Sequence, residues 1–258
     1  MTVPHLAPPV WGLVFSVGSC VVLWLISLRI RDTGIVAIFW GPGIAGVVDI
    51  AAWLGLAGGS RASTALFLVN VWAIRLAAYI FARRDGEDRR YAAMRHHYGS
   101  RWAWLSLMQV FLLRAILIWF IPAPLVAAML ASRAPMGWLD YLGIALAGLG
   151  LACEAVADNQ MARFRLDPAN RSRVLDRRLW ALSRHPNYTG EIVMWAGFFL
   201  IGFSASHAWW LVLSPLAVFL LLQQAAAEME LGMEQHRPGY AVYRARVGVF
   251  LPRFTPRG

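Results

Sequence analysis

Residues 104–130 read WLSLMQVFLLRAILIWFIPAPLVAAML, and this stretch decides the class of fold. Arg114 is its one charged residue. A helix that crosses a bilayer needs roughly 20 mostly apolar residues, and buried helices of soluble domains seldom reach that length without charges. The stretch therefore predicts that this part of the chain folds in lipid.

The rest of the chain follows the same pattern. Of its 258 residues, 59% are hydrophobic and 15% are charged, which is a lower charge content than soluble domains carry. Lipid offers the backbone no hydrogen bonds, so apolar runs must cross it as helices. We predict an all-α, polytopic integral membrane protein of about seven transmembrane helices without a separate soluble domain. The runs cover residues 10–28, 34–56, 63–82, 104–130, 138–158, 188–203 and 207–228.

The distribution of arginine predicts the orientation. All 24 basic residues are Arg, and most lie in the first, third and fifth loops and in the C-terminal tail. The second and fourth loops hold one each, Arg61 and Arg133. Basic loops stay in the cytoplasm, so seven spans with the N-terminus outside and the C-terminus cytoplasmic satisfy every loop. Only residues 204–206 separate the last two runs, which leaves a six-span alternative open.

Charge and cysteine content narrow the range of partners. The formal charge of +10 favours anionic partners, namely lipid headgroups or a phosphate-bearing cofactor. Nucleic acid is a poor fit because the arginines lie in loops beside the membrane. Cys20 and Cys153 are far apart inside apolar runs, and they provide neither metal-ligand spacing nor a reason for a disulfide. We therefore predict no metal site.

Polar residues cluster around the end of the fifth run, where they are costly and indicate a site. Glu154 and Asp158 are one helical turn apart, so they share a helix face. Arg165 and Arg173 follow, and then the segment 183–191, SRHPNYTGE. Arg forks suit phosphates, carboxylates accept ribose hydroxyls, and an Asn can hold a carboxamide. Any single loop arginine can instead serve topology or lipid binding.

Residues 182–191 resemble the signature of bacterial membrane proteins of the domain-of-unknown-function 1295 family, which is allied to the C-terminal domain of steroid 5-alpha-reductases. Similar motifs are WAIRL at 72–76, DGEDRRY at 85–91, and the paired tyrosines before Pro252. The resemblance implies reduction of an activated carbon–carbon double bond by NADPH. The lipophilic substrate would be a steroid-like enone or an unsaturated lipid.

The same resemblance implies a layout for the protein. We expect one membrane domain over residues 1–258, with an apolar substrate cavity among the helices of 1–131 and the cofactor held within 138–258. The protein would lie in a bacterial inner membrane, with the cofactor site on the cytoplasmic side. The positions that contact the cofactor in the steroid reductases correspond in this sequence to Glu154, Asp158, Arg165, Arg173, Asn187 and Glu191. We add the adjoining Tyr188 to these predicted cofactor-binding residues.

The substrate side departs from the steroid reductases. Their Gln–Glu pair, which polarises the substrate carbonyl, has no counterpart in the sequence WGPG at 40–43. Asp49, further along the same run, and Tyr79, one turn beyond Arg75, are the candidates for the catalytic proton donor. The identity of the lipid, the oligomeric state, and the roles of three tail residues stay open: Glu228, Glu230 and His236.

Two other functions compete with the reductase. Membrane methyltransferases that use S-adenosylmethionine, of the isoprenylcysteine and phospholipid types, have a similar Arg-His-Pro-x-Tyr-x-Gly core. A channel or transporter could line its path with Asp49, Arg75, Arg114 and Glu154, although no inverted repeat is evident. Arg75 and Arg114 could instead pair with acids inside the bundle or extend toward the interface.

Overall fold

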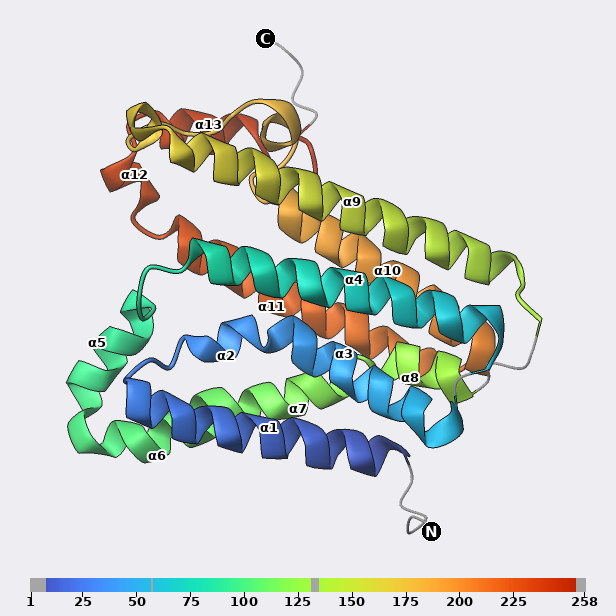
Figure 1. Ribbon diagram of the computed structural model, residues 1–258. Coiled ribbons are helices and arrows are strands. Elements are labelled where there is room, and N and C mark those ends of the chain that lie inside the picture. Colours follow the sequence, from blue (N-terminus) through green and yellow to red (C-terminus); the bar gives the residue numbers. More distant parts are fainter. Residues whose placement is uncertain (1–7, 57, 131–134, 254–258) are drawn as a thin grey trace. The chain divides into compact units, whose positions relative to one another are not determined.

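Helices make up all the regular structure in the computed structural model, which describes residues 8–56, 58–130 and 135–253. Within these ranges there is no strand (Figure 1). Among the described residues, six helices are long and apolar enough to cross a membrane, so the prediction of an all-α, multi-pass membrane protein is confirmed. They are Pro8–Ile30, Gly59–Arg83, Arg89–Leu130, Trp138–Leu166, Pro186–Ser206 and Trp209–Glu230. Arg133, in the predicted fourth loop, lies outside the described residues.

The predicted count of seven spans is not confirmed, because the run at 34–56 is broken. It divides into α2 (Ile35–Ile38), α3 (Trp40–Ala51) and the π-helix η1 (Ala52–Leu56). Its longest apolar helix, Trp40–Leu54, is shorter than a full span. The orientation of the two termini stays a prediction.

The last two runs are separate helices, so they do not merge as the six-span alternative required. α10 (Pro186–Ser206) ends where the sequence predicted a break, and the short helix η6 (Trp209–Val212) leads into α11 (Leu213–Glu230). His207 between them has a positive φ of 56°. A left-handed residue of this kind cannot continue an α-helix, so it separates the two spans.

The chain divides into two compact units. Unit 1 comprises Met1–Tyr141 and Phe199–Ser214, and unit 2 comprises Leu142–Phe198 and Pro215–Gly258. The end of α10 and the start of α11 belong to unit 1, and the expected roles of residues 1–131 and 138–258 stay predictions. Long helices therefore contribute to both units.

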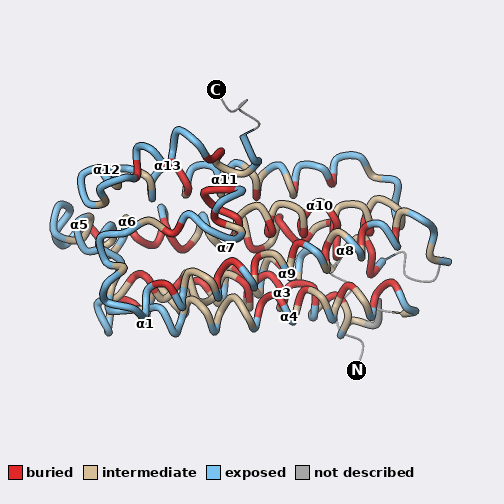
Figure 2. The backbone as a smooth tube through the Cα atoms, turned by 90° about the horizontal axis from the view of Figure 1, so that it is seen from above, coloured by how far each residue is buried: buried red, intermediate tan, exposed pale blue. Residues whose placement is uncertain are grey.

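In unit 1, α3 is the central helix. It packs against α1 (Pro8–Ile30), α4 (Gly59–Arg83), α7 (Leu113–Phe120) and α8 (Ala123–Leu130). A Cβ atom at Gly41 would lie 2.9 Å from the Cα of Ala73, so α3 and α4 approach closely here. Buried Ile44, Val48 and Trp72 fill the interior. The exposed helix α5 (Arg89–Tyr98) is pale blue in Figure 2, and η2 (Gly99–Arg101), α6 (Trp102–Ser106) and the π-helix η3 (Leu107–Leu112) lead from it to α7.

Arg61, predicted to lie in a loop, is buried inside unit 1. Its Nε donates to Asp140 Oδ1 at 2.7 Å and its Nη2 to Oδ2 at 2.8 Å. Ser204 donates a further hydrogen bond to the same carboxylate, also at 2.8 Å. This buried ion pair joins α4 to the start of α9 and to the end of α10, and every member has a partner.

Unit 2 contains most of α9 (Trp138–Leu166), of α10 and of α11. Small apolar clusters hold the segments between them. Phe164 at the end of α9 packs with Leu175 and Trp180, and Tyr240 packs with Tyr243 and Val247. The short elements are η4 (Pro168–Asn170), η5 (Arg178–Ala181), α12 (Met233–His236) and α13 (Tyr240–Arg246).

Candidate cofactor site

Helices α9 and α10 touch backbone to backbone through glycines. A Cβ atom at Gly190 would lie 2.6 Å from Glu154 N and 2.6 Å from Gly150 O. Seven residues along α10, a Cβ atom at Gly197 would lie 2.5 Å from Gly143 O. Small residues allow membrane helices to approach in this way. The contact brings the predicted residues at the end of α9 beside those at the start of α10.

One polar contact between these helices joins Asp158 and Asn187. Asn187 Nδ2 donates to Asp158 Oδ1 at 3.2 Å. Asp158 is 4% exposed, and two further predicted carboxylates are also buried, Glu154 at 2% and Glu191 at 7%. Four of the seven predicted cofactor residues therefore lie on α9 and α10 around one close helix contact.

Two buried amide oxygens of this region lack a hydrogen bond from the described residues. Asn187 Oδ1 and Gln160 Oε1 receive no donor from any residue that the structure describes. The carboxylate of Asp158 attracts the NH₂ group of Asn187, so the amide oxygen is the atom left over. We call Asp158, Gln160 and Asn187 the amide site. Its two amide oxygens can accept hydrogen bonds from N–H or O–H groups of a ligand.

The predicted arginines lie at the exposed edge of unit 2. Arg165 is exposed near the end of α9, about 10 Å along the helix axis from Asp158. Arg173 is exposed in the loop that follows, where its carbonyl oxygen accepts a hydrogen bond from Arg237 Nη1 at 3.3 Å. The phosphate contacts of the two arginines remain predictions.

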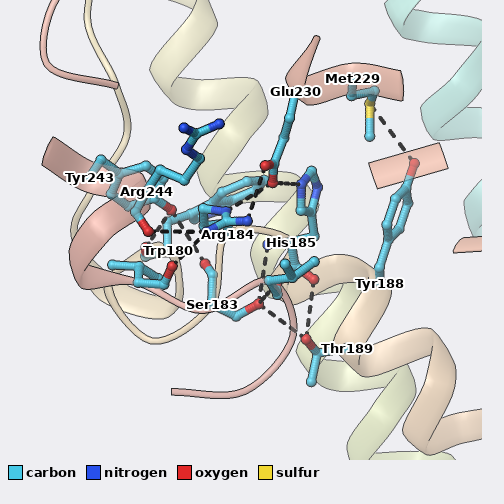
Figure 3. Close-up of polar contacts among 12 residues, drawn as sticks. Trp180, Ser183, Arg184, His185, Tyr188, Thr189, Met229, Glu230, Tyr243 and Arg244 are labelled. Atoms are coloured by element: carbon cyan, nitrogen blue, oxygen red, sulfur yellow. Dashed lines mark hydrogen bonds and ion pairs between the residues drawn. The ribbon is translucent and has the colours of Figure 1, made fainter. Parts of the chain in front are cut away.

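A second polar cluster surrounds Glu230, at the end of α11 (Figure 3). Arg184 Nε and Nη2 donate to its two oxygens at 2.9 and 3.0 Å, which is a bidentate ion pair. His185 Nε2 lies 2.9 Å from Oε1 of the same carboxylate. The sequence left the role of Glu230 open, and the structure places it between these two signature residues. An acidic residue directly after an apolar span was the available signal.

The signature segment also holds the C-terminal tail. Ser183 Oγ donates to Val249 O at 2.7 Å, and Thr189 Oγ1 donates to Phe250 O at 2.9 Å. The backbone N–H groups of Arg184 and His185 donate to the carbonyls of residues 248 and 249. We call Ser183, Arg184, His185, Thr189 and Glu230, with the tail residues 248–250, the tail clamp. Several residues of the segment that resembles the family signature therefore hold the C-terminal tail in place.

Burial sets the protonation of the groups around the clamp. It lowers the pKa of His185, and the hydrogen bond to Glu230 opposes this only partly. The neutral ring therefore donates its Nε2–H to the carboxylate. Burial raises the pKa of Tyr240 to about 12 and also raises the pKa of Tyr243. Tyr243 stays neutral and donates its hydroxyl to Trp180 O at 2.7 Å.

Tyr188 lies beside the signature residue His185. Its ring stacks on His185 with centroids 5.5 Å apart, and its hydroxyl points toward Met229 Sδ at 3.9 Å. Tyr188 therefore packs beside the tail clamp. Its cofactor role stays a prediction.

The two candidate proton donors, Asp49 and Tyr79, are not neighbours. Asp49 is exposed on α3 and accepts a hydrogen bond from Asn70 Nδ2 of α4 at 2.8 Å. Tyr79 lies nine residues beyond Asn70, about 13.5 Å along α4. The guanidinium of Arg83 lies 5.1 Å from the centre of its ring. The two residues are therefore alternatives and not a pair.

Comparison with known proteins identifies relatives of the whole chain. The family described as "Protein of unknown function (DUF1295)" matches residues 23–247. An uncharacterized protein of Schizosaccharomyces pombe, C594.04c, is 27% identical over 278 residues, which cover 95% of this chain and 80% of the yeast protein. No solved structure matches the chain. The family match includes the amide site and every side chain of the tail clamp.

Proposed function

Because the chain belongs to the DUF1295 family, we propose that it is an NADPH-dependent reductase of an activated carbon–carbon double bond in a lipophilic substrate. The alliance of this family with the steroid 5-alpha-reductases is part of the proposal. The main support for this proposal is the buried amide oxygen of Asn187, which receives no hydrogen bond from any described residue.

An unsatisfied buried acceptor costs about 1–3 kcal/mol. A bound ligand with an N–H donor at this position would recover that free energy. The carboxamide of nicotinamide is such a donor, and Asp158 would orient Asn187 to receive it. The residues present therefore fit the nicotinamide end of the cofactor.

The phosphate end needs positive charge. Arg165 and Arg173 are exposed on the same unit, where their forks could bind phosphate oxygens. NADPH differs from NADH by one phosphate group, so these arginines would favour NADPH. The arginine content of these loops favours a site on the cytoplasmic side of the membrane, which is part of the proposal.

When bound, NADPH supplies a hydride to the substrate. The chain has to orient the nicotinamide, exclude water and deliver a proton. We assign the first task to Asn187 and Glu191. Asp49 or Tyr79 would supply the proton.

Ligand-dependent thermal stability tests the cofactor. A ligand that binds only the folded state stabilises it by about 2.7 kcal/mol at 100 times its Kd. We expect NADPH to raise the unfolding temperature of the purified protein in a non-ionic detergent, and S-adenosylmethionine to leave it unchanged. The opposite result would assign the protein to the membrane methyltransferases.

Matched variants test the site. Asn187→Ala removes the proposed acceptor, whereas Asn159→Ala removes a similar amide from an exposed neighbour of Asp158. We expect only the first to abolish the NADPH effect. Glu191→Gln should also reduce NADPH oxidation with a panel of lipophilic enones. Normal oxidation in both Asn187→Ala and Glu191→Gln would refute the site.

A further inference from the structure

Arg114 in unit 1 is an arginine deep within a membrane-spanning segment. It follows Trp102 by 12 residues and precedes Leu130 by 16. Both ends of the helical stretch 102–130 are therefore at least 12 residues away, and an α-helix of 12 residues is about 18 Å long. Such a distance excludes the explanation that the side chain extends to a headgroup region, as arginines near helix ends do.

The Arg114 side chain faces the neighbouring helices. Its Cζ lies 5.3 Å from the centroid of the Trp40 ring at the start of α3. Its charge also acts on the buried thiol of Cys20 in α1. Since α7 packs against both α1 and α3, the guanidinium lies on the inner side of α7. It is half-buried there.

In the part of the chain that the structure describes, this guanidinium has no anionic partner. No carboxylate or carbonyl oxygen among the residues that the structure describes lies within ion-pair or hydrogen-bond distance of it. Asp49 lies nine residues beyond Trp40 on α3, about 13.5 Å away along the axis, and is bonded to Asn70. The sequence had left open whether Arg114 pairs with an internal acid, and the described residues hold no such pair.

The contrast with Arg61 indicates what is missing. Arg61 is buried in the same unit, and it donates two hydrogen bonds to the carboxylate of Asp140. The Trp40 ring gives Arg114 a cation–π contact, but it uses none of the five N–H donors. The π-helix η3 lies directly before α7, and π-helical turns often accompany functional sites.

We propose that Arg114 and Trp40 form a binding site for the carboxylate of a long-chain amphiphile that enters unit 1 from the bilayer. The guanidinium fork matches a carboxylate with two hydrogen bonds, while Trp40 covers one face of the cation. The apolar helices around it accept the tail. A free anion would lose its hydration with no apolar contact in return, so the lipid is the favoured source.

This site does not depend on the proposed reductase activity, and the two are tested with different ligands. The binding experiment uses the full-length protein in dodecyl maltoside at pH 8. Oleate, oleyl alcohol and inorganic phosphate are compared by thermal shift and native mass spectrometry. We expect oleate to bind and to stabilise the protein, and the alcohol and phosphate to do so at least about tenfold more weakly.

Matched variants separate this site from general detergent-like effects. Arg114→Met should weaken oleate binding at least about tenfold, whereas Arg101→Met, at an exposed arginine 13 residues earlier in the chain, should leave it unchanged. Without ligand, Arg114→Met should raise the unfolding temperature, because it removes an unpaired charge from an apolar interior. A purely structural arginine would give a lower unfolding temperature instead.

Several outcomes overturn the proposal. Equal oleate affinity in wild type and Arg114→Met removes the site, and equal binding of oleyl alcohol removes the role of charge. Phosphate binding as tight as oleate would make it a site for free anions and not for lipids. If Arg114→Met does not fold, Arg114→Lys keeps a charge without the fork, and unchanged oleate binding there contradicts bidentate recognition.

Discussion

The tail clamp and the amide site are both polar clusters of unit 2, but they differ in how completely their atoms are satisfied. In the clamp, the Glu230 carboxylate receives three hydrogen bonds from Arg184 and His185. In the amide site, two buried oxygens receive none from the described residues. A completed network holds its own chain together, whereas an incomplete one is suited to a ligand. The two clusters should therefore respond differently to substitution.

Removal of Glu230 should have the largest effect on stability. Glu230→Ala leaves the buried guanidinium of Arg184 without its bidentate partner. Breaking a buried ion pair in this way costs about 3–5 kcal/mol. We expect a large drop in the unfolding temperature, and proteolysis should then begin at the C-terminal tail.

Glu228→Ala provides the control for this substitution. Glu228 lies on the same helix and is exposed, with a hydrogen bond from Gln224 that water can replace. We expect its effect to be within about 1 kcal/mol. Similar losses in the two variants would contradict the distinction between a buried clamp and a solvated surface acid.

Gly190→Ala should disturb the amide site with a somewhat smaller loss of stability. The added Cβ atom would lie 2.6 Å from the backbone of α9, so the two helices must separate. Overpacking of this kind costs about 1–3 kcal/mol. Thermal unfolding and NADPH titration measure the two consequences, and we expect both stability and NADPH binding to fall.

Gly148→Ala is the matched control on α9. No atom lies within 4 Å of its added Cβ. Alanine favours a helix over glycine by about 1 kcal/mol, so this variant should be neutral or slightly more stable. If Gly190→Ala behaves in the same way, α9 and α10 do not need close contact.

The sequence predicted the helices well because apolar runs reveal themselves by composition. It located six of the spanning helices, and it brought Asp158 and Asn187 into one site through motif resemblance. It could not show that α2 and α3 divide the second run, since a broken helix and a continuous one have the same hydropathy. Nor could it assign Glu230, because 45 residues separate it from His185. Pairing at that distance depends on how helices pack.

Tyr243→Phe should cause a modest loss of stability beside the tail clamp. The substitution removes the hydrogen bond to Trp180 O at 2.7 Å but keeps the ring. A hydrogen bond of this type contributes about 1 kcal/mol. Chemical denaturation should show a loss of that size, while Tyr141→Phe, at a tyrosine 63% exposed, should show none. An unaffected Tyr243→Phe protein would mean that the tail is held without this contact.

The smallest predicted effect is a dependence on pH that arises from His185. Burial places its pKa below the ordinary value of 6.5, so the unfolded chain takes up the proton first as pH falls. The contribution of neutral His185 to the free energy of unfolding is therefore fully present above about pH 6.5, and it decreases as the pH falls toward the lower pKa of the folded state. The positive charge of Arg184 opposes protonation, whereas Glu230 favours it. His185→Gln keeps an N–H donor for Glu230 without a titrating ring. Between pH 7.5 and pH 5, we expect the unfolding temperature of the wild type to fall more than that of this variant. Parallel curves of unfolding temperature against pH would show that His185 is not the titrating group.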